Sequence, residues 1–333
     1  MRPALIVAVL LFAGRVAWAD EPDLDLAVRR GLSAVQSAAA IYPKHRKCFS
    51  CHHQTLPMLA VATARDRGLA TDAKLLAAQA EFTRESFLNK IDDLHAGKNI
   101  GGRGMTVGYA LWALALADSR ADDTTEALAA YLLKTQAKDG SWAGQATRPP
   151  LEESKVTGTV LAVAGLKRYA TEEQRQLAVA AIDTAKGWLV AAKPVSQEDR
   201  AARLWGLFLL KSKPAELDAA RTDTLAAQRP DGGWAQTDSM ASDAYATGQA
   251  LYVLHTTGLP VTDPAYRRGV RFLLLTQRPD GAWLVKTRSK PIQPYVEADD
   301  LDPLGKDQFI SVPATGWAVA ALAAAHTDKR KAD

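Results

Sequence analysis

Gln228-Arg-Pro-Asp-Gly232-Gly-Trp234 is one of three closely matching loops from which the architecture of this chain can be read. The other two copies are Gln136-Ala-Lys-Asp-Gly140-Ser-Trp142 and Gln277-Arg-Pro-Asp-Gly281-Ala-Trp283. Each loop follows an amphipathic stretch, and its Asp-Gly pair favours a tight turn. The tryptophan can pack under that turn, and the glutamine can satisfy backbone groups at the end of a helix. Recurrence of such a unit predicts a helical repeat protein.

A second shared stretch, centred on glycine, follows these loops. It reads Val156-Thr-Gly158-Thr-Val160, Ala246-Thr-Gly248-Gln-Ala250 and Ala314-Thr-Gly316-Trp-Ala318, with a fourth copy in Thr106-Val-Gly108-Tyr-Ala110. Glycine inside a helix costs roughly 0.5–1 kcal/mol relative to alanine. Its recurrence at one place in each copy predicts that neighbouring helices approach closely there.

Two further stretches, 52–64 and 199–210, fit the same spacing and complete a set of six helical hairpins. The first and last of the expected inner helices are apolar, whereas an open array needs polar caps at its ends. We therefore predict an all-α protein: a single (α/α)6 toroid over residues 20–333. Inner helices are expected to begin near residues 52, 105, 156, 200, 245 and 313. Outer helices are expected over 24–39, 72–90, 124–136, 172–192, 214–228 and 264–277.

The three loops and the Thr-Gly helices resemble the repeats of the prenyltransferase and squalene-cyclase superfamily. The resemblance implies a central cavity lined by the starts of the inner helices, but it does not identify an activity. Triterpene cyclases of this kind protonate a polyene with an aspartic acid in an Asp-x-Asp-Asp-Thr-type motif. The matching stretch here, Asp243-Ala-Tyr245-Ala-Thr247, has a tyrosine at the place of the proton donor. A phenol with a pKa of about 10 cannot replace a carboxylic acid, so squalene-type cyclisation is disfavoured.

The N-terminus has the features of a secretory signal peptide over residues 1–19. Arg2 precedes an apolar run over 4–13, and Ala17-Trp18-Ala19 is a small-x-small cleavage site. We expect a periplasmic or secreted protein with no membrane span in the mature chain. The net charge of +4 comes from interspersed charges, and no basic cluster with aromatic residues supports nucleic-acid binding.

Both cysteines of the chain lie in Cys48-Phe-Ser-Cys51-His52. Two thiols and a following histidine at this spacing form the attachment motif of haem c, in which the histidine ligates the iron. This segment resembles c-type cytochromes, although the rest of the chain does not. The leading prediction is therefore a covalent haem c on Cys48, Cys51 and His52, serving electron transfer to a periplasmic partner or redox chemistry on a hydrophobic molecule in the cavity.

Other residues complete this hypothetical site. Met105 begins the next inner helix and is the candidate for the sixth iron ligand, with His95 in the preceding loop as a second choice. Arg103 could bind a haem propionate. His53 and Asp243 are the candidates for acid–base groups that face the cavity. Glu152 and Glu153 also precede an inner helix and could face the cavity or cap the helix.

Several alternatives to haem stay open. Cys48 and Cys51 could form a short disulfide or exchange thiols, and a zinc ion could be held by this cluster with ligands from elsewhere. Without haem, the chain would be a terpenoid- or prenyl-type transferase or lyase, or a toroid that binds a hydrophobic ligand without chemistry. Asp92-Asp93 and Asp299-Asp300-Leu-Asp302 could hold Mg²⁺ and a diphosphate, although charged loop residues are usually only solvated.

Overall fold

The computed structural model describes residues 23–144, 148–289 and 304–326. The expected signal peptide and Asp299–Asp302 lie outside these described residues. Within them the chain is helical, and the only β-contact is an isolated bridge between Trp234 and Asp243.

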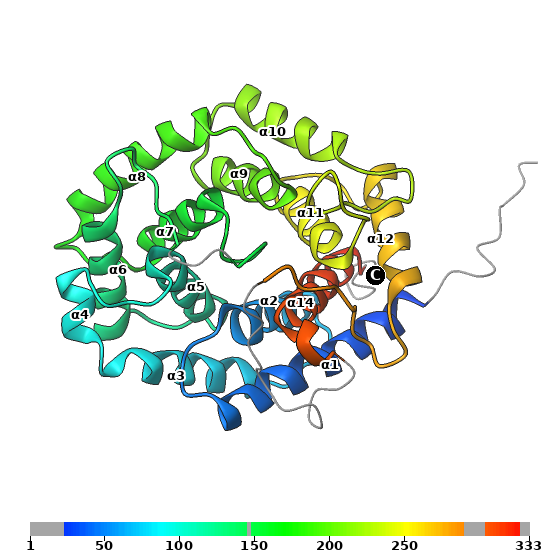
Figure 1. Cartoon of the computed structure of the whole chain (residues 1–333), viewed down its shortest axis with the longest axis horizontal. Helices are drawn as coiled ribbons and strands as arrows, with labels where there is room; N and C mark the ends of the chain where they lie inside the picture. Colours follow the sequence, from blue (N-terminus) through cyan, green and yellow to red (C-terminus); the bar gives the residue numbers. More distant parts are fainter. Residues whose placement is uncertain (1–22, 145–147, 290–303, 327–333) are drawn as a thin grey trace, which may run out of the picture.

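The helices form two concentric rings (Figure 1). The outer ring contains α1 (Leu24–His45), α3 (Leu75–Leu88), α6 (Asp123–Thr135), α8 (Arg175–Ala191), α10 (Pro214–Ala226) and α12 (Pro264–Thr276). The inner ring contains α2 (Leu56–Asp66), α5 (Arg103–Leu116), α7 (Lys155–Tyr169), α9 (Gln197–Leu209), α11 (Ala244–Thr256) and α14 (Gln308–Ala325). A π-helical turn, η1 (Cys51–Thr55), leads into α2, the short α4 (Ile91–Ala96) precedes α5, and a 3-10 turn, η2 (Gly305–Asp307), precedes α14.

The inner ring is closed. Each inner helix contacts the next one along the chain, and α14 contacts both α11 and α2. Burial differs between the rings as this arrangement requires: α14 is buried on all sides, whereas the four buried residues of α8 recur at three- and four-residue spacings along one face. The prediction of an all-α toroid of six hairpins is confirmed.

The three repeated loops have one shared hydrogen-bond pattern. In each, the glutamine Nε2 donates to the glycine carbonyl of its own loop and to a carbonyl of the next outer helix, namely Ala181, Ala265 or Ala27. The tryptophan Nε1 donates back to the preceding outer helix, at 2.8–2.9 Å. Gln277 thereby joins α12 to α1, so the third loop closes the outer ring.

The recurrent glycines lie where inner helices touch. A Cβ on Gly316 would lie 2.5 Å from the carbonyl oxygen of Leu56 in α2, and one on Gly248 would lie 2.6 Å from backbone atoms of α14. Close approach of neighbouring helices is confirmed at these positions.

One copy of the Thr-Gly alignment is shifted by two residues. Trp234 and Trp283 donate their backbone N–H to the threonine before the glycine, but Trp142 donates to Thr159, which follows Gly158. Val160 therefore occupies the place of the glycine. Gly206 on α9 provides the room instead, because a Cβ there would lie 2.5 Å from Val160 Cγ2.

Helix α14 belongs to the core. The segment Gly305–Ala325 is long and apolar enough to cross a membrane, but 94% of its apolar 18-residue stretch is buried inside the protein. The helix starts before the expected residue 313 and continues through Pro313.

Candidate functional site

Polar side chains gather where the inner helices begin, and two cavities open there. The first, here called the cysteine pocket, has a volume of about 310 Å³ and is lined by Cys48, Cys51, His52, Arg148 and Glu152, among others. The second, here called the Glu198 pocket, has a volume of about 500 Å³ and lies at the starts of α7 and α9. Both volumes are within the range of small-molecule sites.

Glu198 is the most unusual ionisable group of the inner ring. It lies in the first turn of α9, is only 3% exposed, and accepts hydrogen bonds from two neighbouring inner helices. Thr157 Oγ1 donates to Oε1 at 2.6 Å, while Tyr245 OH and Gln249 Nε2 donate to Oε2 at 2.9 and 2.8 Å. Burial raises the pKa of Glu198 to about 7, against the opposing effect of the three donors.

The phenol of Tyr245 lies against this carboxyl group. The family resemblance places Tyr245 where a cyclase would carry its acid, and its hydroxyl donates directly to Glu198. The first turn of α9 therefore places a carboxyl group beside the Tyr245 hydroxyl. Glu198 was not predicted from the sequence, because the cyclase motif was compared only with Asp243–Thr247, which belongs to another helix. The available signal was the position of Ser196-Gln-Glu-Asp199 at the start of an inner helix.

Two buried amides next to Glu198 keep polar atoms without a protein partner. These are Oε1 of Gln249 and both Oε1 and Nε2 of Gln197, whose side chains are 4% and 1% exposed. Buried polar atoms in proteins are normally hydrogen-bonded. Buried amide atoms without a protein partner are typical of a site that holds water or a polar group of a ligand.

Four aromatic side chains meet across the ring. Trp112 on α5 lies 5.1 Å from Trp205 on α9 and 5.9 Å from Trp317 on α14, between ring centroids. Tyr252 on α11 lies 5.5 Å from Trp317. An aromatic face stabilises a cation that lies within about 6 Å of its ring centroid.

Asp243 has a structural role in α11. Its Oδ1 accepts from the backbone N–H of Ala246, which caps the helix, and its Oδ2 accepts from Gln236 Nε2, both at 2.9 Å. Burial raises the pKa of Asp243 to about 6. His53, the other predicted acid–base residue, lies in η1 and stacks on Tyr42, with 5.3 Å between the ring centroids.

The cysteine–histidine segment forms the π-helical turn η1. Ser50 caps it by accepting from the His53 N–H at 3.1 Å. His52 and His53 are buried, and their Nδ1 atoms are hydrogen-bonded to each other. Burial lowers the pKa of both imidazoles well below the usual range, so the pair is neutral. The His52 ring also packs against Tyr42 and Phe309, at 6.1 and 5.0 Å.

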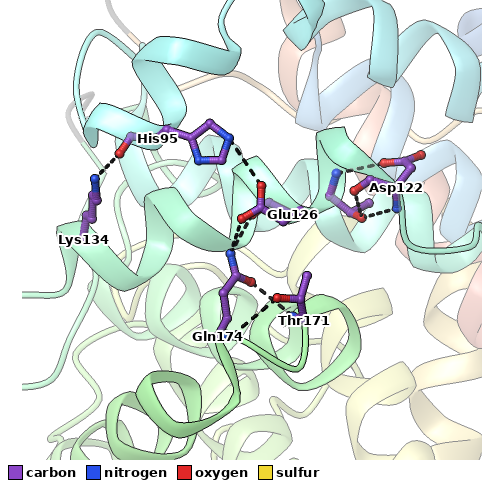
Figure 2. Close-up of polar contacts among 7 residues, drawn as sticks. His95, Asp122, Glu126, Lys134, Thr171 and Gln174 are labelled. Carbon is purple, nitrogen blue, oxygen red and sulfur yellow. Dashed lines mark hydrogen bonds and ion pairs between the residues drawn. The ribbon is translucent and has the colours of Figure 1, made fainter.

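The remaining predicted residues lie elsewhere. Met105 is 1% exposed and packs beside Gly158, while Arg103 lines a third cavity with Tyr131. His95 Nε2 lies 3.3 Å from a carboxylate oxygen of Glu126, in a polar network that Figure 2 shows. Met105, Arg103 and His95 thus each have neighbours other than His52.

Comparison with solved structures identifies the fold. The chain is similar to a protein from Actinoplanes, with a TM-score of 0.57 and 16% identity over 92% of this chain and 100% of that chain. It is also similar to a variant of the type II terpene cyclase MstE from Scytonema in complex with geranylgeranyl dihydroxybenzoate, with a TM-score of 0.53 and 14% identity over 90% and 98% of the two chains.

A glycosidase variant aligns over the same shares, 90% and 98%, with a TM-score of 0.57 and 10% identity. Comparisons with protein-family models and with curated protein sequences found no match. The similarities establish the α/α toroid, shared by proteins of different chemistry.

The prediction of haem c, and of zinc as its alternative, is wrong. The fold is that of type II terpene cyclases, which need no haem. Among the described residues, no group of three or more His, Cys, Asp or Glu side chains could hold a metal ion. The predicted ligands are committed to other contacts: the His52 ring to His53, the Cys51 thiol to Glu152, and Met105 to the core.

Proposed function

We propose that the chain is a haem-free enzyme of the terpenoid type, a lyase or cyclase that protonates an apolar alkene bound inside the ring. The observation that carries this proposal is Glu198, a buried carboxyl group with a pKa of about 7. A catalytic acid works best when its pKa lies near the ambient pH, because it is then both protonated and able to donate.

Aromatic side chains of the inner helices suit this reaction. Transfer of a proton to a carbon–carbon double bond leaves a carbocation, which an apolar cavity without charge compensation would destabilise. The ring holds Trp112, Trp205, Trp317 and Tyr252, which lie within 6 Å of one another in pairs. Electron-rich aromatic faces stabilise such a cation. Loss of a proton from a neighbouring carbon then ends the reaction, with no co-reactant required.

The carboxyl group is also held in one orientation. Thr157, Tyr245 and Gln249 fix both of its oxygens from α7 and α11. A water molecule between Gln197 and Gln249 would satisfy their free polar atoms and could return a proton to Glu198 after each turnover. The MstE complex, which contains a geranylgeranyl compound, supports a polyprenyl chain as the class of substrate.

The test is turnover of linear polyprenyl alcohols in D₂O, followed by mass spectrometry. Protonation by Glu198 places one solvent deuterium in the product. Glu198→Gln should abolish this incorporation while retaining binding of the alcohol, and Glu172→Gln, at an exposed surface ion pair, should leave turnover unchanged. If the wild-type protein binds polyprenyl alcohols but never turns them over, the chain is a ligand-binding toroid instead.

Export remains a prediction, because residues 1–19 lie outside the described part of the chain. The electron-transfer partner was predicted only as part of the haem c hypothesis.

A further inference from the structure

The two cysteines lie in unlike environments beside one cavity. Cys48 is exposed and Cys51 is 7% exposed; both are free thiols that line the cysteine pocket. The hydroxyl of Tyr42 lies 3.6 Å from Cys48 Sγ, and the pKa of Tyr42 is raised mainly by burial, with electrostatic contributions from both cysteines. The sulfurs therefore share one buried hydroxyl group as a neighbour.

A carboxyl group accompanies the buried cysteine. The Cys51 thiol donates to Glu152 Oε1 at 3.7 Å, and the Glu152 side chain is 15% exposed. Burial raises the pKa of Cys51 and also that of Glu152. Cys51 is therefore held as a thiol, next to a group that can accept its proton.

We propose that Cys48 and Cys51 form a dithiol–disulfide exchange centre that acts on a small anionic disulfide in the cysteine pocket. Cys48 is the attacking residue because it is exposed, and Cys51 is the resolving residue because it is buried. This activity is independent of alkene protonation at Glu198.

The exchange balances in two steps. The Cys48 thiolate attacks one sulfur of the incoming disulfide, its S–S bond breaks, and the first thiol leaves with a proton. Cys51 then transfers its proton to Glu152 and attacks Cys48 Sγ, which forms the Cys48–Cys51 bond and expels the second sulfur as a thiolate. Glu152 returns the proton to this thiolate, which leaves as the second thiol. Two hydrogens and two electrons pass from the cysteines to the small molecule, and the reverse sequence reduces the protein.

The charges of the pocket indicate an anionic substrate. Its lining includes three cationic side chains, Arg46, Lys90 and Arg148, against a single carboxylate, Glu152. Three cations against one carboxylate give the lining a net positive charge, which attracts a negative ligand. Glutathione disulfide, which carries several carboxylates, is the appropriate probe.

The spacing itself argues against a structural role for this pair. A disulfide between Cys48 and Cys51 closes a very short loop and would stabilise the fold little through chain entropy. Exchange centres are typically bridges of this kind, with one accessible sulfur and one protected sulfur.

The first experiment follows intact mass while the full-length wild-type protein equilibrates with reduced and oxidised glutathione. The wild type should lose two hydrogens by forming the internal disulfide. Cys51→Ser should instead accumulate one glutathione on Cys48, and Cys51→Ala serves as a second variant if the serine is poorly tolerated in the buried site. Cys48→Ser should react at least about tenfold more slowly, because its remaining thiol is buried.

The second experiment separates the roles of Glu152 and the cations. Glu152→Gln should slow the resolving step, so that the mixed disulfide builds up, while the first attack keeps its rate; Glu172→Gln is the surface control. The double variant Arg46→Gln/Lys90→Gln should slow attack on glutathione disulfide about tenfold but not attack on neutral hydroxyethyl disulfide. The proposal is overturned if the wild type stops at glutathionylated cysteine, or if Cys48→Ser and Cys51→Ser react equally fast.

Discussion

Two opposing effects act on the pKa of Glu198: hydrogen-bond donors lower it, and burial raises it. Three donors favour its charged form, while removal from water disfavours that form more strongly, and burial is the larger effect on its pKa. The result is a carboxyl group that titrates near neutrality rather than in its ordinary range. Both its proposed activity and its effect on stability therefore depend on pH.

We expect the rate of the proposed reaction to fall as pH rises above about 7, because Glu198 then loses the proton that it must donate. Gln249→Leu removes a donor that lowers this pKa, so it should move the falling limb to higher pH. Gln236→Leu removes the matching donor to Asp243 and is the control. A shift in the control variant alone would identify Asp243 as the acid, and pH–rate profiles of both variants decide the matter.

The same residue should make stability depend on pH. Its pKa rises from 4.5 to about 7 on folding, so the folded state favours the protonated form. Below pH 4.5 the group is neutral in both states, and above about 7 it is charged in both, which costs the fold about 3 kcal/mol. Urea unfolding should therefore show that Glu198→Gln gains stability over wild type as pH rises through this window. A difference between Glu198→Gln and wild type that stays constant with pH would contradict the buried titration.

Single residues were the hardest part to predict. The motif spacing singled out Cys48, Cys51 and His52 as a haem site, but it could not show that the His52 ring is bonded to His53. Consecutive helical residues normally point to different faces, and here a π-helical turn brings the two rings together. Glu198 carries no motif of its own, because its neighbours come from α7 and α11 and meet only in the folded ring.

The hairpins are the scale at which sequence reasoning was most successful. The glutamine and tryptophan of each repeated loop have the contacts that their chemistry suggested, because both groups bond to backbone carbonyls that any sequence provides. The register of α7 was harder to predict from the sequence. Gly158 looks like the other recurrent glycines, but the space for Val160 is provided by Gly206 on the facing helix α9. A single segment of sequence does not show which residue of one helix faces which residue of its neighbour.

We expect Gly316→Ala to destabilise the protein by at least about 2 kcal/mol, because the added Cβ would lie 2.5 Å from a backbone oxygen of α2. Gly187→Ala is the matched control: it lies inside α8 with no atom within 4 Å of the added Cβ. That change should stabilise the protein by up to about 1 kcal/mol through helix propensity. Chemical denaturation of both variants measures the contrast, and similar values for the two would remove the case for close packing at Gly316.

The whole molecule depends on closure between its first and last hairpins. The apolar terminal helices allowed this closure to be predicted, since neither could be left facing water. The structure adds the contacts between the first and last hairpins: α14 packs on α2, Gln277 joins α12 to α1, and His326 Nε2 lies 2.9 Å from Asp25 Oδ1. The proposed reaction also depends on the closed ring, because the aromatic side chains that would stabilise the carbocation come from α5, α9, α11 and α14.

Truncation should distinguish a closed ring from an open helical array. In an open array each repeat contacts only its neighbours, so removal of the last helix leaves the others folded. Here α14 contacts α1, α2, α11 and α12, and removal of residues 308–333 would expose the apolar faces that it covers. We expect this shortened chain to lose its cooperative thermal transition and to bind a hydrophobic dye, whereas removal of residues 327–333 alone should change neither. Sharp, cooperative melting of the chain without α14 would show that the hairpins fold as an array and that closure adds little to stability.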